Sequence, residues 1–374
     1  MTGEDLNFTV SRESSKEINA SRQTSDSIQV DAEAAGSVNL EMSYSEYDPF
    51  LEALLAGSFD TSFAGSTNTK QLTVSFVAGG TNTITDDGSD GFAGLVVGQW
   101  VSFVGDSSAA NDGIYLITAM TDDELTVDAS TPVSTTAASV LVNVSSSRLE
   151  IGTVAQRSFS VEKQFTDVDQ YFIMKGMCPS KLDLSFSTGA IVTGSVGFLG
   201  TGSARADATA LPGTLAAAES FGLINSVTGV GAVAGAGGIF LRDGSTNLLA
   251  DTFVQSMAIS VDAALRTQKS IGVLGAAGVA TGTFKITGSL EVYLADGELY
   301  DKALDDTTVS ITFPIHDSSG NGYAFTFSDI KLGVPTVAAG SMDSDIVLSF
   351  EFDALAPDTS TDSCIKIDRF GEAI

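Results

Sequence analysis

Short runs in which apolar and polar residues alternate make up most of this chain. In SVNLEMSY (37–44), KLDLSFS (181–187) and SDIVLSFEF (344–352) the larger apolar side chains occupy every second position. Successive side chains of a strand point to opposite faces, so this period predicts strands with one covered and one polar face. Further strand-like runs stand at 157–165, 171–177, 189–200, 256–265, 283–294, 308–315 and 323–332. The pattern predicts a mainly β protein.

A short helix is predicted directly after the strand at 37–44. Asp48 is a good N-cap, Pro49 suits the first helical position, and Gly57 offers a left-handed stop. The apolar residues between them follow helical spacing, which gives one stripe to lie on a sheet. A similar strand and helix return at 288–304, where Tyr300 and Asp301 enter the second helix.

The two halves of the chain repeat this order of elements. Each has an alternating strand, a helix with a Tyr-Asp pair and later closing strands, which favours two modules in tandem. A second similarity, between IVTGSVGF (191–198) and VATGTFKI (279–286), would align the two halves differently and is attributed to shared strand composition. A single module with additions is the alternative.

Changes in strand pattern and composition along the sequence divide the chain into five parts. Regular short strands with Asp, Asn and Gly turns at 66–147 predict a small inserted barrel or sandwich. The Ala-, Gly- and Thr-rich stretch at 201–250 is interpreted as a linker or surface excursion. The expected parts are an N-terminal arm (1–30), a first module (31–65 and 148–200), the insert (66–147), the linker (201–250), and a second module with the C-terminal tail (251–374).

Charge and composition narrow the function. The chain has 374 residues, 43% of them hydrophobic, and a formal charge of −29. It can bury a substantial core, and its field would repel phosphate, so tight binding of nucleic acid is not expected. The N-terminus does not resemble a secretory signal, and the longest apolar run, 228–241, is too short for a membrane span. Two distant cysteines, Cys178 and Cys364, suit a reducing compartment, although a disulfide between them stays open.

The usual signatures of catalytic, metal and cofactor sites are weak. The single histidine, His316, precedes Asp317 and Ser318 in a strand end whose side chains would point to opposite faces. DDGSDG (86–91) begins like a calcium loop, but Val97 stands where the bidentate acid is required. GVGAVAG (229–235) has the wrong glycine spacing for a dinucleotide fingerprint. We therefore expect no enzyme, no metal and no cofactor.

Two longer stretches resemble a known family. RQTSDSIQVDAEAAGSVNLEMSYSEYDPFLEALLAGSF (22–59) and RSFSVEKQFTDVDQYFIMKGMCPSKLDLSFSTGAIVTGSVGFLG (157–200) are similar to the tail tube (major tail) proteins of long-tailed, siphovirus-like bacteriophages. The resemblance covers most of residues 20–65 and 148–355, and the insert departs from it. It implies a mainly β fold: tail-tube β-sandwich or barrel modules, two in tandem here, each with a short flanking helix, plus the small all-β insert.

The resemblance also implies a function. The subunit would assemble into trimeric or hexameric rings that stack into a hollow tube, a conduit for DNA ejection. Its partners would be copies of itself, the tape measure, tail terminator and tail-tip proteins, and double-stranded DNA in transient, non-specific passage. It would be made and assembled in the host cytoplasm and end in the virion.

Site residues follow from the strand pattern and the resemblance together. Acids on polar strand faces could line the lumen and repel phosphate; the candidates are Asp183, Asp262, Glu291 and Glu351. An ordinary solvated outer face is the alternative for each. Contacts between rings are expected from the arm and from the loop that contains Phe165, Asp167 and Tyr171.

Three other classes compete with the tube. A secreted or surface adhesin or carbohydrate-binding protein would need an export signal and exposed aromatic residues, and the chain has one Trp. A β-rich hydrolase would need a catalytic constellation. A baseplate or sheath component is the nearest alternative among phage tail proteins.

Overall fold

Strands make up most of the protein in its computed structural model. The structure describes residues 1–18, 20–21, 23–60, 63, 68–79, 81–105, 111–128, 133–135, 139–153, 156–211, 222–224, 238–244, 246–250, 252–295, 297–339, 342, 345–357 and 362–371. Within these ranges there are two helices, each of seven residues, among many antiparallel strands. The prediction of a mainly β chain is confirmed.

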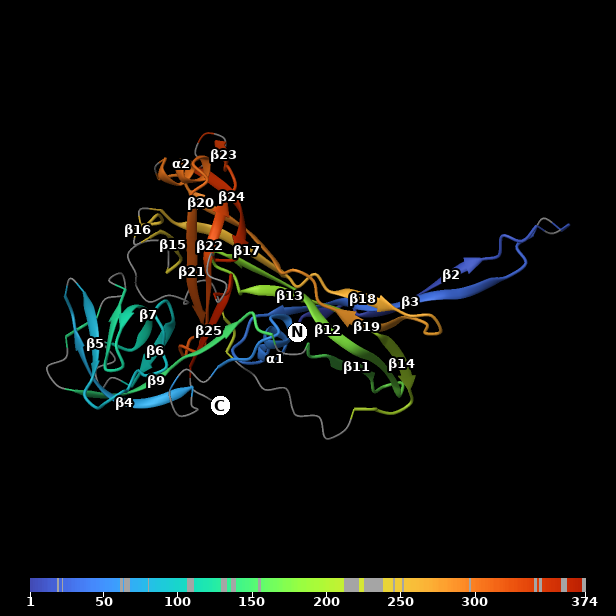
Figure 1. Ribbon diagram of the computed structural model, residues 1–374, viewed down its shortest axis with the longest axis horizontal. Helices are drawn as coiled ribbons and strands as arrows, with labels where there is room; N and C mark the ends of the chain where they lie inside the picture. Colours follow the sequence, from blue (N-terminus) through green and yellow to red (C-terminus); the bar gives the residue numbers. More distant parts are fainter. Residues whose placement is uncertain are drawn as a thin grey trace.

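Six long strands form one continuous antiparallel sheet through the body of the molecule (Figure 1), which we call the six-strand ladder. In order of pairing they are β3 (Ser27–Glu41), β13 (Thr193–Gly200), β12 (Gln170–Ser187), β17 (Val254–Asp262), β20 (Lys285–Tyr293) and β24 (Ile346–Leu355). The first three come from the first half of the chain and the last three from the second half.

The register of the ladder places apolar side chains in rows on one face. One such row crosses all six strands: Leu40, Gly194, Leu184, Ile259, Gly288 and Phe352. Its four larger side chains are buried in the main core. Gly288 makes room for Phe352, since a Cβ there would lie 2.2 Å from the ring of Phe352. The alternation seen in the sequence thus becomes a two-sided sheet with one side facing the core.

A second layer of strands covers that apolar face. It contains β21 (Thr308–His316), β22 (Gly322–Leu332), β25 (Lys366–Phe370), β10 (Ser147–Glu150), β15 (Phe240–Asp243) and β16 (Thr246–Asn247). β22 leaves the ladder by pairing with the end of β24 and then pairs with β21 and β25. Phe313 on β21 packs edge-on against Phe186 on β12, with ring centroids 5.3 Å apart. The body is therefore a sandwich whose two layers are connected by β22, which pairs with β24 of the ladder and with β21 and β25 of the second layer.

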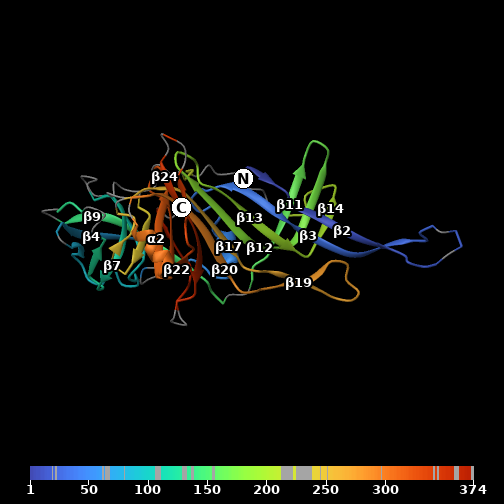
Figure 2. The same ribbon diagram turned by 90° about the horizontal axis from the view of Figure 1, so that it is seen from above.

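Three hairpins extend from one end of the ladder, as Figures 1 and 2 show. The longest joins β2 (Asn7–Ser14) to β3, beside the short β1 (Gly3–Glu4). The second joins β18 (Arg266–Lys269) to β19 (Ala276–Ala280), and the third joins β11 (Phe159–Phe165) to β12, flanked by β14 (Gly202–Ala206). Residues 1–30, expected as an arm, form β1, β2 and the beginning of β3.

Helix α1 (Asp48–Leu54) lies where the sequence predicts it, but its ends are built differently. Tyr47 is the N-cap, with no side-chain cap bond, and Asp48 is buried instead. The carboxylate of Asp48 accepts hydrogen bonds from the Tyr323 hydroxyl (2.5 Å) and from Arg369, while burial raises its pKa. The left-handed residue is Ala56 (φ 50°), not Gly57. Glycine is needed at 57 because a Cβ there would lie 2.4 Å from the Glu150 carbonyl oxygen.

The second helix completes a repeated arrangement. Helix α2 (Glu298–Leu304) follows β20 as α1 follows β3, and begins two residues before the predicted Tyr300. Strand pairing also repeats: β2, β3, β13 and β12 are consecutive neighbours in the first half, and β17, β20, β24 and β22 in the second. In each half a hairpin leads into a helix, and the second strand of that hairpin pairs with the last long strand of its half.

A small closed barrel lies to one side of the body (Figure 1). Its strands, in order of pairing, are β4 (Thr69–Val77), β5 (Asn82–Asp86), β8 (Glu124–Val127), β7 (Gly113–Met120), β6 (Trp100–Val104) and β9 (Val140–Ser145). The barrel has a core of its own, in which Phe103 contacts Phe76, Phe92 and Tyr115. Its strands all fall inside the insert expected at 66–147.

The barrel is held on the body by a buried polar junction. The Trp100 backbone amide donates to Asp368 Oδ2 (2.9 Å), and its indole Nε1 donates to Thr312 Oγ1 (2.8 Å). Arg148 Nε donates to Asp368 Oδ1 (2.6 Å), and Asp368 is fully buried. A second ion pair joins Arg242 of β15 to Asp128, which follows β8. The Arg148–Asp368 pair itself lies within the body, between β10 and β25, and it reaches the barrel through the Trp100 amide and through the Gly98 carbonyl oxygen, to which Arg148 donates (2.8 Å).

The domain boundaries that the sequence predicts at 65/66, 147/148, 200/201 and 250/251 stay predictions. The stretch at 201–250 contains β14, β15 and β16, while 212–221 and 225–237, with the GVGAVAG segment, lie outside the described residues.

Removing the buried charge at the junction should destabilise the protein strongly. Asp368→Asn leaves Arg148 buried without a counter-charge, and a broken buried ion pair costs about 3–5 kcal/mol. We expect a clear fall in the thermal unfolding midpoint by calorimetry. Glu33→Gln, an exposed acid on β3, is the matched control and should leave the midpoint near the wild-type value. Equal midpoints for the two variants would contradict this account of the junction.

Candidate functional site

The outer side of the six-strand ladder is polar, and we call it the polar face. It consists of four cross-strand rows set by the same register as the core. They contain Ser37, Gly197, Lys181, Asp262 and Lys285; then Asn39, Ser195, Asp183, Ser260, Thr287 and Asp353; then Glu41, Thr193, Ser185, Ala258, Ser289 and Glu351; and last Ser187, Ser256, Glu291 and Ser349.

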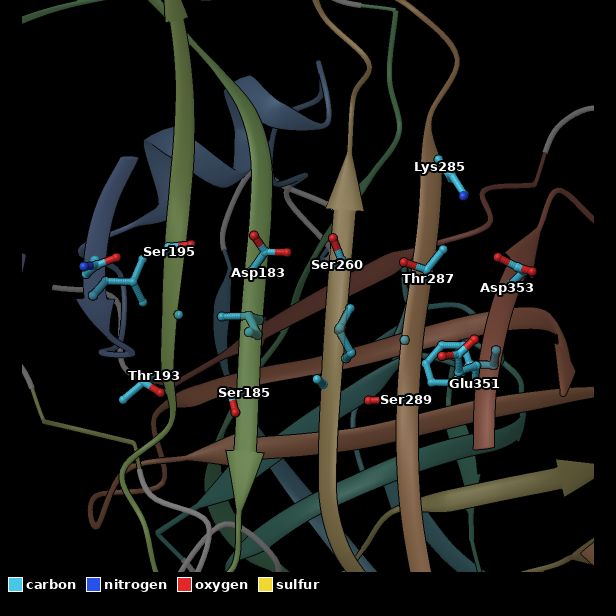
Figure 3. Close-up of a pocket in the computed structure, with 18 of the residues that line it drawn as sticks. Asp183, Ser185, Thr193, Ser195, Ser260, Lys285, Thr287, Ser289, Glu351 and Asp353 are labelled. Carbon is cyan, nitrogen blue, oxygen red and sulfur yellow. The ribbon is translucent and has the colours of Figure 1, made fainter. Parts of the chain in front are cut away.

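This face is hollowed. A depression of about 960 Å³ is lined by residues from all six strands of the ladder. Figure 3 shows the labelled serines, threonines and acids on neighbouring strands around it. Serines and threonines are the largest group among the lining residues, and the charged side chains of Asp183, Lys285, Glu351 and Asp353 lie beside them.

Negative charge predominates on the polar face. Its carboxylates are Glu41, Asp183, Asp262, Glu291, Glu351 and Asp353, against the two lysines Lys181 and Lys285. The four acids expected from the sequence all lie here, on four different strands or strand ends. The sequence reasoning missed Glu41 and Asp353, although the alternation continues through both: Glu41 follows Leu40, and Asp353 stands two residues after Glu351.

Several of these acids have local partners. Asp183 forms an ion pair with Lys181 (2.9 Å), and both side chains are more than 40% exposed. Asp262 Oδ1 accepts a hydrogen bond from the Ala264 amide (2.7 Å), and Glu291 accepts one from the Ser256 hydroxyl (2.6 Å). Exposed pairs of this kind add little stability. Glu351 and Asp353 are exposed, while the other four carboxylates of the face are partly exposed.

The three residues expected to make contacts between rings lie together on the β11–β12 hairpin. Phe165 ends β11 and is about half exposed, Asp167 lies in the exposed turn, and Tyr171 pairs across to Gln164. The ring of Phe165 meets that of Phe172 edge-on, at 6.0 Å between centroids. Val168, at the tip of the same turn, is also exposed. The structure thus brings the three residues to one protruding hairpin.

The other chemical candidates do not form sites among the described residues. His316 Nδ1 contacts the Asp317 carbonyl oxygen (2.7 Å), while the Asp317 carboxylate accepts from the Ser319 and Asn321 amides. In the described part of the chain, no three His, Cys, Asp or Glu side chains are grouped in a way that could hold a metal ion. Cys178 and Cys364 are both free, so the open question of a disulfide is answered in this structure.

Neither described helix is long and apolar enough to cross a membrane.

Comparison with known protein families identifies the chain. The model of the phage tail tube protein family matches residues 2–354.

The chain belongs to the phage tail tube protein family.

The match spans nearly the whole chain, including the residues of the barrel. A direct search of curated proteins returned no match. Tail tube proteins are structural components of the virion tail, which agrees with a polar face built from small hydroxyls and acids rather than from a catalytic set. The expectation of a tail tube fold is confirmed.

A matched pair of substitutions tests the two-sidedness of the ladder in this tail tube protein. Leu184 is 2% exposed in the core, and its neighbour Ser185 lies on the polar face. Leu184→Ala should lower the free energy of unfolding by about 2–5 kcal/mol, through lost burial and the cavity left behind. Ser185→Ala should change it by less than about 0.5 kcal/mol. Chemical denaturation of both variants measures the difference, and similar losses would contradict the assigned faces.

Proposed function

We propose that this chain is the repeating subunit of a phage tail tube, forming rings that stack into a hollow conduit for DNA. The observation that carries the proposal is the six-strand ladder, which has a buried apolar face and a concave, acidic, hydroxyl-lined polar face. A sheet of this kind gives each subunit a ready segment of tube wall. In the proposed tube, the polar face forms the lumen.

Free strand edges give the ladder a means of continuing from one subunit to the next. Among the described strands, β23 (Thr336–Ala339) pairs only with β24, and β1 and β2 pair only with β3. Exposed edges favour pairing with another chain. We propose that ring closure joins the β1–β2 side of one copy to the β23 side of its neighbour.

The repeated arrangement of strands supports three chains in a ring. If each half of the chain supplies one equivalent segment of wall, a trimer provides six segments and pseudo-sixfold symmetry. A ring of six chains is the other expected state. The hairpin with Phe165, Asp167 and Tyr171 and the β2–β3 arm are proposed as contacts between successive rings.

An acidic lumen suits the passage of DNA. Each phosphate carries a negative charge, so a wall on which carboxylates outnumber lysines gives the duplex no strong electrostatic hold. The further proposed partners are the tape measure, tail terminator and tail-tip proteins, with assembly in the host cytoplasm before the tube joins the virion. The adhesin alternative is not favoured, because the single Trp, on barrel strand β6, is buried between the barrel and the body.

Electron microscopy of the purified chain tests assembly. Concentrated protein in negative stain should form hollow stacked rings, and averaging along the axis should show three large subunits in each ring. Six identical subunits would contradict the trimer while leaving the tube intact. Protein that remains dispersed and monomeric at every concentration would contradict self-assembly.

Reversing charges on the polar face should slow DNA without preventing tube formation. Glu351 and Asp353 are both exposed, so Glu351→Lys with Asp353→Lys should fold normally. Phage carrying both changes should eject DNA several-fold more slowly at low salt and recover as salt rises, because phosphate contacts are screened. Ejection can be followed by dye fluorescence after receptor addition.

The matched control places the same charge change on the barrel. Asp122→Lys with Glu124→Lys alters two exposed acids away from the polar face. This variant should eject DNA at the wild-type rate. If both double variants behave like wild type, the polar face does not line the path of the DNA.

A further inference from the structure

The lysines of the polar face are confined to one of its ends. Lys181 lies opposite Asp262, and Asp262 lies opposite Lys285, so both lysines belong to a single cross-strand row. Lys285 is the first residue of β20, next to the end from which the β18–β19 hairpin extends. Arg266, the first residue of that hairpin, is also exposed. We call Lys181, Lys285 and Arg266 the basic end.

The opposite end of the same face is acidic. Glu291 lies in the last row, and Asp345 is an exposed residue directly before β24. Lys302 of α2, the helix that follows β20, is already paired with Asp243. We call Glu291 and Asp345 the acidic end.

Lys285 at the basic end and Asp345 at the acidic end are available for new contacts. Within the described part of the chain, the Lys285 side chain has no hydrogen bond or ion pair, and the Arg266 side chain donates only to the Thr281 carbonyl oxygen. Asp345 has no hydrogen bond or ion pair to a described residue either. Lys181 is already paired with Asp183, so Lys285 is the cation of this end that has no ion pair with a described residue and that the fold of a single copy does not use.

Exposed apolar side chains accompany the charges at both ends. Ile271, Val273 and Leu274 lie at the tip of the β18–β19 hairpin beyond the basic end. Phe253, Leu294 and Ile346 lie where β17, β20 and β24 begin or end at the acidic end, joined by the Tyr293–Phe253 and Leu294–Ile346 backbone bonds. Apolar patches bordered by opposite charges are typical of surfaces that bind a partner.

We propose that the basic end of one copy docks against the acidic end of a second copy, with Lys285 and Arg266 meeting the carboxylates of Asp345 and Glu291. Because the two ends differ in charge, like ends repel and the copies stack in one direction only. The apolar groups supply contact area, and the charges set polarity and register. This inference rests on the proposed function, since stacked rings bring the two ends of the polar face together.

Charge reversal tests the docking directly, because every interface in a head-to-tail stack contains one end of each kind. Lys285→Glu and Asp345→Lys alone each place like charges together. We expect each to raise the protein concentration needed for tubes by about tenfold or more at low salt, while leaving single rings intact. The double variant, Lys285→Glu with Asp345→Lys, restores opposite charges and should form tubes near the wild-type concentration. Negative-stain microscopy measures tubes, and mass photometry measures rings.

Two controls carry the same charge changes on the barrel, Lys70→Glu and Glu124→Lys, and should stack like wild type. Circular dichroism and thermal melting check folding. The milder substitutions Lys285→Gln and Asp345→Asn replace any variant that misfolds, and each should raise the protein concentration needed for tubes by a smaller factor. Single reversals that stack like wild type would overturn the inference. That result is expected if the lysines contact DNA instead of a second copy. A double variant no better than the singles would also overturn it. Wild-type protein that forms no rings would contradict the proposed function itself.

Discussion

The register of six paired strands is the constraint on which the rest of this molecule depends. Side chains alternate between faces with a period of two, so a slip of one residue in any strand would exchange its core residues for its polar ones. In β12 that slip would expose Leu182 and Leu184 and bury Asp183 in their place. The cost of burying that charge holds the register. The same register aligns the hydroxyls and carboxylates of the polar face in rows, so core and candidate site have one physical origin.

The inserted barrel shows how an addition can be attached without disturbing that sheet. Its own core is complete, and its contacts with the body go to β15, β21 and β25 of the second layer rather than to the polar face. Trp100 serves both parts: its backbone belongs to a barrel strand, and its ring packs against Phe240 of β15. The paired charges of Arg148 and Asp368, on the neighbouring body strands β10 and β25, hold this position through the barrel: Asp368 accepts from the Trp100 amide, and Arg148 donates to the Gly98 carbonyl oxygen.

Repetition within the chain explains several features that look unrelated along the sequence. β3 with α1 and β20 with α2 occupy equivalent places in two similar pairing schemes, and the β2–β3 and β17–β20 hairpins extend from the same end. The two halves nevertheless differ in the contacts that their helices make with the rest of the molecule. Asp48 of α1 is buried against Tyr323 and Arg369, whereas α2 presents Glu298 and Asp301 in its first turn. The two units are therefore similar in strand pairing while their helices have different surroundings.

Local pattern predicted most of the long strands, both helices, the separate β-rich insert and the acids at 183, 262, 291 and 351, because period and turn chemistry act between near neighbours in sequence. It did not predict β14, β15 and β16, which lie in the stretch interpreted as a linker or surface excursion. It could also have supplied Glu41 and Asp353, which continue the same alternation. It could not show that β12 and β17 pair, since that contact joins the two halves and depends on which strand edges remain free after each half has folded. Nor could it show that Asp48 would be buried rather than cap its helix, because Tyr323 and Arg369 reach it from residues more than 270 positions away. The division of lysines and acids between the two ends of the polar face was likewise decided by tertiary structure, which alone places Lys181 and Lys285 in one row.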